Sequence, residues 1–129
     1  MRAREYERAQ RGKTPAMKWI VRYIFPGGAL DHLSMLVGNL ENYAFEVHDI
    51  EALRGHYERT TRIWHDRLSA NRKEAELEVG RAKTRLWLAW LASCALTFSH
   101  GSIGVFQTLA SKRVRGASGL PPTREGLYR

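Results

Sequence analysis

The sequence predicts an α/β fold with about three helices and two sheet strands. Two observations support this prediction: apolar residues recur at helical spacing in three segments, and polar and apolar residues alternate in two others. The order is helix, strand, two helices, strand. With 129 residues, the chain can form one small domain, which is too little for a two-layer enzyme that carries its own cofactor domain.

The first helix is predicted over residues 31–41, where Asp31 can cap the first free backbone amides. Its apolar face comprises Leu30, Leu33, Leu36, Val37 and Leu40. The first strand is predicted over residues 43–50, because Tyr43, Phe45 and Val47 alternate with more polar residues. This strand should have one drier face.

The second helix is predicted from Glu51 to about Asn71, and the third from Glu74 to Phe98. The last strand starts near residue 103 and ends at Lys112 and Arg113. The longest apolar run, residues 86–98, spans 13 residues. At 1.5 Å per residue this run is too short to cross a hydrocarbon layer of roughly 30 Å.

Positive charge gathers at both ends of the chain. The net charge is +8, of which residues 1–22 contribute +5 and residues 112–129 contribute +4. Basic ends suit an anionic partner, either a phospholipid surface or a nucleic acid, and solvated tails explain the pattern equally well. Nucleic acid is disfavoured because the basic residues are not interleaved with aromatic ones. No signal peptide is visible, so we expect a cytoplasmic protein, with peripheral contact at the inner membrane face as an option.

Neither the cysteine nor the histidines indicate a reactive or metal centre. The single cysteine, Cys94, lies in an apolar run and is predicted to be a buried thiol. Several histidines come from separate segments without zinc-type spacing, so no metal site is predicted; they are His32, His48, His65 and His100.

Two motifs carry a family resemblance. The segment Tyr23-Ile24-Phe25-Pro26-Gly27-Gly28 resembles the Y-I-F-P-G-G motif of cyclopropane-fatty-acyl-phospholipid synthases and mycolic-acid cyclopropane synthases. A second stretch is similar to the family's D-x-E-x-L-R-x-H-Y-x-x-T-x-x-x-W-x-x-R pattern, through Asp49, Glu51, Leu53, Arg54, His56, Tyr57, Thr60, Trp64 and Arg67. The resemblance covers roughly residues 19–128.

This resemblance implies a Rossmann-like class I methyltransferase that uses S-adenosylmethionine to methylate the double bond of an unsaturated acyl chain. The chain would be the helix-rich C-terminal portion of that domain, over residues 19–113, between a basic arm (1–18) and a basic tail containing Pro and Gly (114–129). An unsaturated phospholipid or acyl chain is the implied substrate.

The resemblance also implies site residues. The family holds a bicarbonate base with a Glu and a His of the cofactor half and with a Tyr that matches Tyr57 here. Periodicity alone favours Tyr57 as a core aromatic. The expected walls of the acyl channel are Phe25, Trp64, Trp87, Trp90 and Phe98. Without the resemblance, the last four of these would be interpreted as core residues.

The cofactor-binding half of the family is expected to be absent. No glycine-rich turn follows a strand, and the family's E-H and H-T motifs are not found before Trp19. We therefore expect no S-adenosylmethionine or bicarbonate to bind this chain alone, and no activity from it alone. The missing half could come from a separate chain. The alternative function is a small non-catalytic module that binds anionic lipid or a partner subunit.

Overall fold

The computed structural model describes residues 15–26, 30–117, 119–121 and 123–128. Its elements, in chain order, are α2 (Pro15–Tyr23), α3 (Leu33–Asn42), β1 (Phe45–Ala52), α4 (Arg54–Ala70), α5 (Arg72–Val79), α6 (Arg81–Ser99), β2 (Phe106–Lys112) and the 3-10 turn η1 (Arg124–Tyr128). From α3 to β2 the structure follows the predicted order, except that three helices lie between the strands where two were predicted. Most of the basic arm lies outside the described residues, as do Gly27 and Gly28 of the Y-I-F-P-G-G motif.

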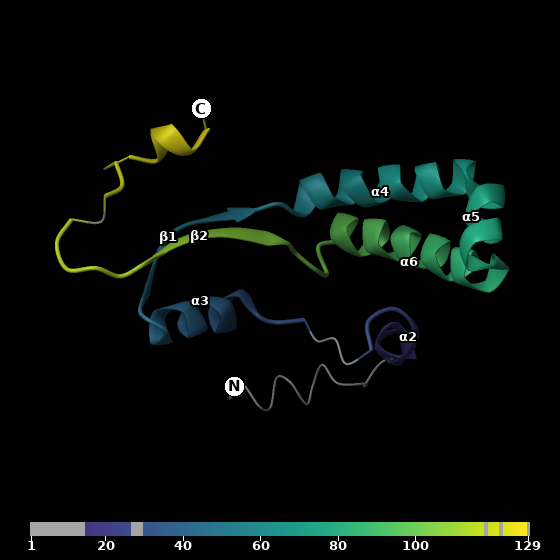
Figure 1. The fold of residues 1–129 in the computed structure, drawn as a ribbon, viewed down its shortest axis with the longest axis horizontal. Helices are drawn as coiled ribbons and strands as arrows, with labels where there is room; N and C mark the ends of the chain where they lie inside the picture. The colour runs from purple at the N-terminus through teal and green to yellow at the C-terminus, as the bar shows by residue number, and fades with distance from the viewer. Residues whose placement is uncertain (1–14, 27–29, 118, 122, 129) are drawn as a thin grey trace.

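The molecule is elongated, with a helical hairpin at one end and a two-stranded ribbon extending from it (Figure 1). Strand β1 leads into α4, the chain turns back through α5, and α6 returns it to β2. The two strands therefore pair antiparallel, from Phe45 opposite Lys112 to Ala52 opposite Phe106. This arrangement places the start of α4 beside the end of α6.

Strand β1 differs from its prediction in how it is buried. Residues on both faces of the strand are half-buried, whereas the alternation predicted one buried and one exposed face. A two-stranded ribbon has too little structure on either side to bury one face fully. The register shifts between Val47 and Asp49, and the ring Nε2 of His48, the residue between them, lies 2.6 Å from the Ser111 hydroxyl oxygen.

The predicted third helix is two helices, because Gly80 breaks it. Gly80 has φ 84° and ψ 153°, a backbone conformation that is essentially reserved for glycine. Helix α5 ends before it and α6 begins after it. The end of α4 is closer to the prediction, since the helix stops at Ala70 and the Asn71 side-chain amide donates to the Arg67 carbonyl, 2.9 Å away.

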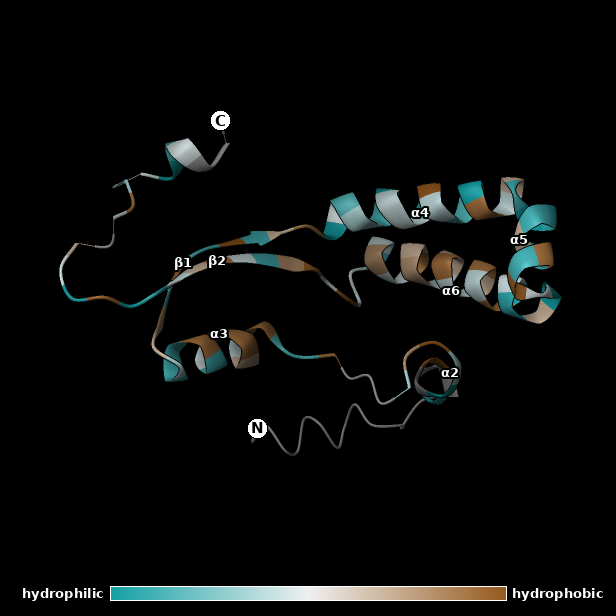
Figure 2. Ribbon diagram, viewed as in Figure 1, coloured by the Kyte–Doolittle hydropathy of each residue, from teal (hydrophilic) through white to brown (hydrophobic). Residues whose placement is uncertain are grey.

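The core lies along α6, where α4 packs against it. Its buried apolar residues are Leu91, Cys94, Ala95 and Phe98, with Ile24 added from the segment after α2. Two buried threonines satisfy their hydroxyls within their own helices, Thr61 on the Tyr57 carbonyl and Thr84 on the Gly80 carbonyl. The apolar stripe expected on this helix is thus confirmed, and Figure 2 shows α6 as more hydrophobic than α4.

The remaining elements lie around this frame. Helix α3 contacts β1. It begins at Leu33, two residues later than predicted, so His32 occupies the cap position without a side-chain capping bond and the capping role expected of Asp31 was wrong. Helix α2 was not predicted. Near the other end, the Arg124 guanidinium pairs with the Asp49 carboxylate and attaches η1 to β1. Among the described helices, none is long and apolar enough to span a bilayer.

Candidate functional site

The candidate site lies where the ribbon joins the hairpin. The Leu53 amide, just after β1, donates to the Val105 carbonyl, just before β2, at 2.8 Å. The Tyr57 amide in turn donates to the Leu53 carbonyl at 3.0 Å, which starts α4 at this junction. The first two turns of α4 are therefore fixed against the last turn of α6 and the start of β2.

Tyr57 faces the inside of this junction. Its ring is half-buried and lies against the ring of Phe98, with 5.8 Å between the ring centroids and 54° between the planes. Phe98 is only 6% exposed. The Tyr57 hydroxyl makes no hydrogen bond to another residue in the described part of the chain. An aromatic wall with one phenol donor is an arrangement that can orient an anion beside an apolar ligand.

A second pair of predicted wall residues also meets. The rings of Phe25 and Trp90 lie edge to face, with centroids 5.8 Å apart and planes at 79°. Phe25 is 51% exposed, and its neighbour Ile24 is buried, so the segment after α2 is anchored on α6. Trp90 and Phe98 are separated by eight residues of the same helix, or roughly 12 Å along its axis.

The other two predicted wall residues do not join these pairs. Trp64 projects from α4 and is 49% exposed, while Trp87 is half-buried one turn before Trp90 on α6. The structure therefore brings together four of the six predicted site residues, as the pairs Tyr57 with Phe98 and Phe25 with Trp90.

Arg54 is a polar residue of the junction to which the sequence analysis gave no role. It lines a cleft of about 320 Å³ with Ala52 and residues 101–106. Its guanidinium occupies the space that a side chain at Gly101 would need, and Gly101 itself has φ 75°. Arg54 precedes Tyr57 by three residues and shares its helix face, a spacing that could have identified it.

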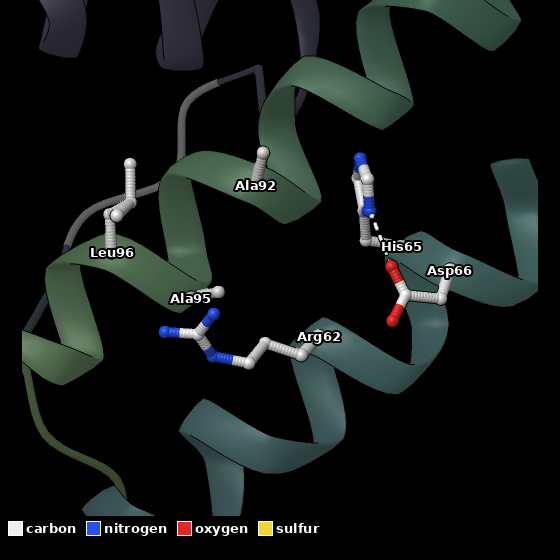
Figure 3. Close-up of a pocket in the computed structure, with 6 residues that line it drawn as sticks. All are labelled: Arg62, His65, Asp66, Ala92, Ala95 and Leu96. Carbon is white, nitrogen blue, oxygen red and sulfur yellow. Dashed lines mark hydrogen bonds and ion pairs between the residues drawn. The ribbon is translucent and has the colours of Figure 1, made fainter.

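A second groove, of about 360 Å³, runs between α4 and α6 (Figure 3). Small residues of α6 form its floor, and the polar residues come from α4; the lining is Arg62, His65, Asp66, Ala92, Ala95 and Leu96. The charged groups are already paired. Arg62 binds Glu58 at 3.2 Å, and the His65 Nδ1 lies 3.0 Å from the Asp66 carboxylate. Because Arg62 and Asp66 each already have a partner, their charges do not indicate a ligand for this groove.

Comparisons with known proteins identify the family. The model of the mycolic acid cyclopropane synthetase family matches residues 1–108. The chain belongs to this family. Its members are S-adenosylmethionine-dependent methyltransferases, so the resemblance found in the sequence is confirmed.

Relatives of the cyclopropane synthetase family resemble the chain over most of its length. It is 40% identical to a probable fatty acid methyltransferase of Pseudomonas putida over 115 residues, covering 88% of this chain and 29% of that protein. It is 35% identical to the hydroxymycolate synthase MmaA4 of Mycobacterium tuberculosis, covering 73% of this chain and 33% of that protein. The chain thus spans about a third of the length of these relatives.

Solved structures confirm the predicted α/β class. The mycolic acid cyclopropane synthase CmaA1, complexed with SAH and CTAB, superposes with a TM-score of 0.71 at 30% identity, covering 83% of this chain and 40% of that one. The cyclopropane synthase MmaA2 from Mycobacterium tuberculosis also superposes with a TM-score of 0.71, at 27% identity, covering 84% of this chain and 40% of that one. The chain corresponds to part of the synthase fold.

The described residues do not fit the methyl donor of the synthetase family. A class I cofactor site needs a glycine-rich turn between a strand and a helix. Here Leu53 alone separates β1 from α4, and Gly55 already belongs to the helix. Nor does the described part of the chain contain a cluster of potential metal ligands.

Proposed function

We propose that this chain forms the acyl-binding side of a cyclopropane-synthase-type methyltransferase. The reaction would transfer a methyl group from S-adenosylmethionine to the double bond of an unsaturated acyl chain. Family membership supports the reaction class. Relatives named as a probable fatty acid methyltransferase and a hydroxymycolate synthase support an acyl substrate. Residues outside this chain would hold the methyl donor.

The observation on which the proposal rests is the Tyr57–Phe98 contact. Methylation of a double bond produces a carbocation, and a ring closes only when a base removes a proton from it. A site for this step needs apolar walls that exclude water and a base held in one position. Phe98 supplies a buried aromatic wall, and the half-buried Tyr57 places a hydroxyl at its edge.

Within this proposal the residues have separate tasks. The Tyr57 hydroxyl donates a hydrogen bond to a bicarbonate ion and orients it as the base, while the ring covers the acyl chain. The Phe25–Trp90 pair, further along α6, lines the acyl channel. Trp87, one turn before Trp90 on α6, extends this wall, and Trp64 would contribute from α4. All of these residues hold the substrate or the base and leave the chemistry of the methyl group to the donor.

Tyr57→Phe tests the proposal, with the remainder of a family methyltransferase supplied in trans or by fusion. Loss of a hydrogen bond to a charged group costs about 1.5–3 kcal/mol, which corresponds to a loss in rate of roughly ten- to a hundredfold. Methyl transfer to unsaturated phospholipid vesicles is measured while added bicarbonate is varied. We expect the variant to lose both rate and bicarbonate dependence.

A matched control is Tyr43→Phe, because Tyr43 is 77% exposed and lies away from the junction at the end of α3. This variant should turn over at the rate of the unmodified chain. If Tyr57→Phe also keeps its rate and its response to bicarbonate, Tyr57 is a packing residue and has no part in holding the base.

A further inference from the structure

The tip of the helical hairpin exposes apolar side chains where a soluble helix normally presents polar ones. Leu77 of α5 is 89% exposed, and Val79 at the end of the same helix is 47% exposed. The half-buried positions of α5 are instead Ala75 and Glu76. Helix α5 lies at the far end of the hairpin from the ribbon (Figure 1). Its largest apolar residue, Leu77, is therefore exposed at that end.

Basic residues outnumber acidic ones in the segments that form this tip. Residues 67–85 contain six basic and three acidic residues, and all six basic ones are exposed: Arg67, Arg72, Lys73, Arg81, Lys83 and Arg85. Of the acidic residues, Glu76 is half-buried and bound to Arg72 at 2.7 Å, whereas Glu74 and Glu78 are exposed on α5. The net charge of residues 67–85 is nevertheless positive, because the ends of α4 and α6 at this tip add only basic residues. A protruding leucine with an excess of basic side chains near it suits the interface of an anionic bilayer, where the headgroups are negative and the acyl layer begins just below.

The position of the tip relative to the aromatic pairs favours a lipid as its occupant. Trp87 lies six residues after the start of α6, followed by Trp90 and then Phe98 beside Tyr57. These half-buried and buried aromatics follow one another from the tip towards the junction. The distance from the end of α4 back to Tyr57 is roughly 20 Å at 1.5 Å per residue. Apolar side chains therefore continue along α6 from the tip to the junction.

We propose that the α5 tip docks the protein on anionic phospholipid membranes, with Leu77 inserted among the lipids and the surrounding Lys and Arg side chains on the headgroups. This proposal rests on the proposed function, because an enzyme that acts on the acyl chain of a lipid has to reach the membrane that contains it. It differs from binding through the basic chain ends, which would leave Leu77 without effect.

Vesicle binding by the 129-residue chain tests this directly. Sedimentation with vesicles of phosphatidylglycerol and phosphatidylcholine is compared with vesicles of phosphatidylcholine alone, and a vesicle-free sample corrects for aggregation. We expect binding only to the anionic vesicles, weakened by salt. Leu77→Glu should lower the partition coefficient at least tenfold. Lys73→Gln combined with Lys83→Gln should lower it on anionic vesicles by about fivefold for each charge removed.

Leu96→Glu is the matched control, because Leu96 is 55% exposed on the same hairpin but lies towards the ribbon end of α6. It should bind vesicles as the unmodified chain does. The proposal is overturned if the unmodified chain does not bind anionic vesicles, if Leu77→Glu binds them as well as the unmodified chain, or if Leu96→Glu loses as much binding as Leu77→Glu.

The same variants separate this inference from the proposed function and from a protein partner. Vesicle binding requires no methyl transfer. A chain that binds vesicles through Leu77 but shows no Tyr57-dependent activity would support membrane docking by the α5 tip and contradict the proposed methyltransferase function. If Leu77→Glu instead abolishes assembly with the remainder of a methyltransferase and leaves vesicle binding unchanged, the tip is a protein interface and the membrane proposal is wrong.

Discussion

Cys94 shows how burial alone determines the behaviour of a side chain in this small core. It is 8% exposed and lies on the face of α6 that also carries Leu91 and Phe98. Desolvation raises the pKa of the Cys94 thiol from 9.0 to about 11. At neutral pH the side chain is therefore a protonated thiol, and it packs as an apolar group. The buried thiol expected from the sequence is confirmed.

The raised pKa of Cys94 makes stability depend on alkaline pH. Between pH 9 and pH 11 the unfolded thiol loses its proton while the folded one retains it, so the folded state binds more protons. Stability is therefore complete below pH 9 and falls as the pH rises towards 11. At 1.36 kcal/mol per pKa unit, the loss is at most about 2–3 kcal/mol. Urea unfolding across this range measures it.

Cys94→Ala provides the comparison, because it removes the titrating group from the same position. Tyrosine and lysine residues also titrate at alkaline pH, so the difference between the two proteins is the quantity of interest. The variant should be less stable at neutral pH, but its free energy of unfolding should change less between pH 9 and pH 11. Identical slopes for both proteins would show that the thiol is solvated.

The two aromatic pairs differ in how far the sequence could predict them. Periodicity places Tyr57 on the inner face of α4 and Phe98 on the inner face of α6, so a contact between two adjacent helices is predictable. The Phe25–Trp90 contact is not, because Phe25 follows the unpredicted helix α2 and its position depends on tertiary packing. Arg54 was missed because its motif position carried no assigned role.

At the scale of elements, one glycine decides the shape of the hairpin. Residues 72–85 are so rich in charge that no apolar period marks a helix end there, and the sequence therefore predicts one continuous helix. The break at Gly80 depends on φ 84°, which residues with a side chain rarely adopt. The strands, by contrast, were predictable from alternation, whereas their mutual pairing depends on the return path through α6.

Gly80→Ala should therefore destabilise the protein through the backbone alone. A methyl group at this position would meet nothing within 4 Å, so no clash contributes. Holding alanine in this conformation costs about 1–3 kcal/mol. The free energy of unfolding, measured by chemical denaturation, should fall by that amount.

Gly55→Ala is the control for that substitution. Gly55 lies in α4 with ordinary helical geometry, and it too has nothing within 4 Å of an added methyl. Alanine is favoured over glycine in helices by up to about 1 kcal/mol, so this variant should be as stable as the original or more so. If both variants are stabilised, α5 and α6 can straighten into the single helix that the sequence indicated.

The whole molecule exposes a large surface for its size. Its accessible surface is 10382 Å², whereas a compact monomer of 14.8 kDa exposes about 7,000 Å². Large apolar side chains are exposed on most elements, including Leu36 of α3, Trp64 of α4, Leu96 of α6 and Phe106 of β2. The outer edges of a two-stranded ribbon also carry backbone groups without a ladder partner.

Such surfaces predict how the isolated chain behaves in solution. Apolar faces and open strand edges of one copy can be covered by those of another, so we expect the 129-residue chain to self-associate, or to be loosely packed when dilute. Sedimentation velocity over a range of concentrations should show the average mass rising with concentration. Calorimetry should show a broad unfolding transition.

The remaining part of a family methyltransferase should compete with this self-association. The chain spans 29% of the Pseudomonas putida relative and 40% of the CmaA1 structure, so the rest of such a domain offers matching apolar surface. Adding it should replace the oligomers by one-to-one complexes and sharpen the unfolding transition. A chain that sediments as a monomer at every concentration and melts sharply on its own would instead be an autonomous domain, whose exposed apolar residues serve contacts other than those with a missing half.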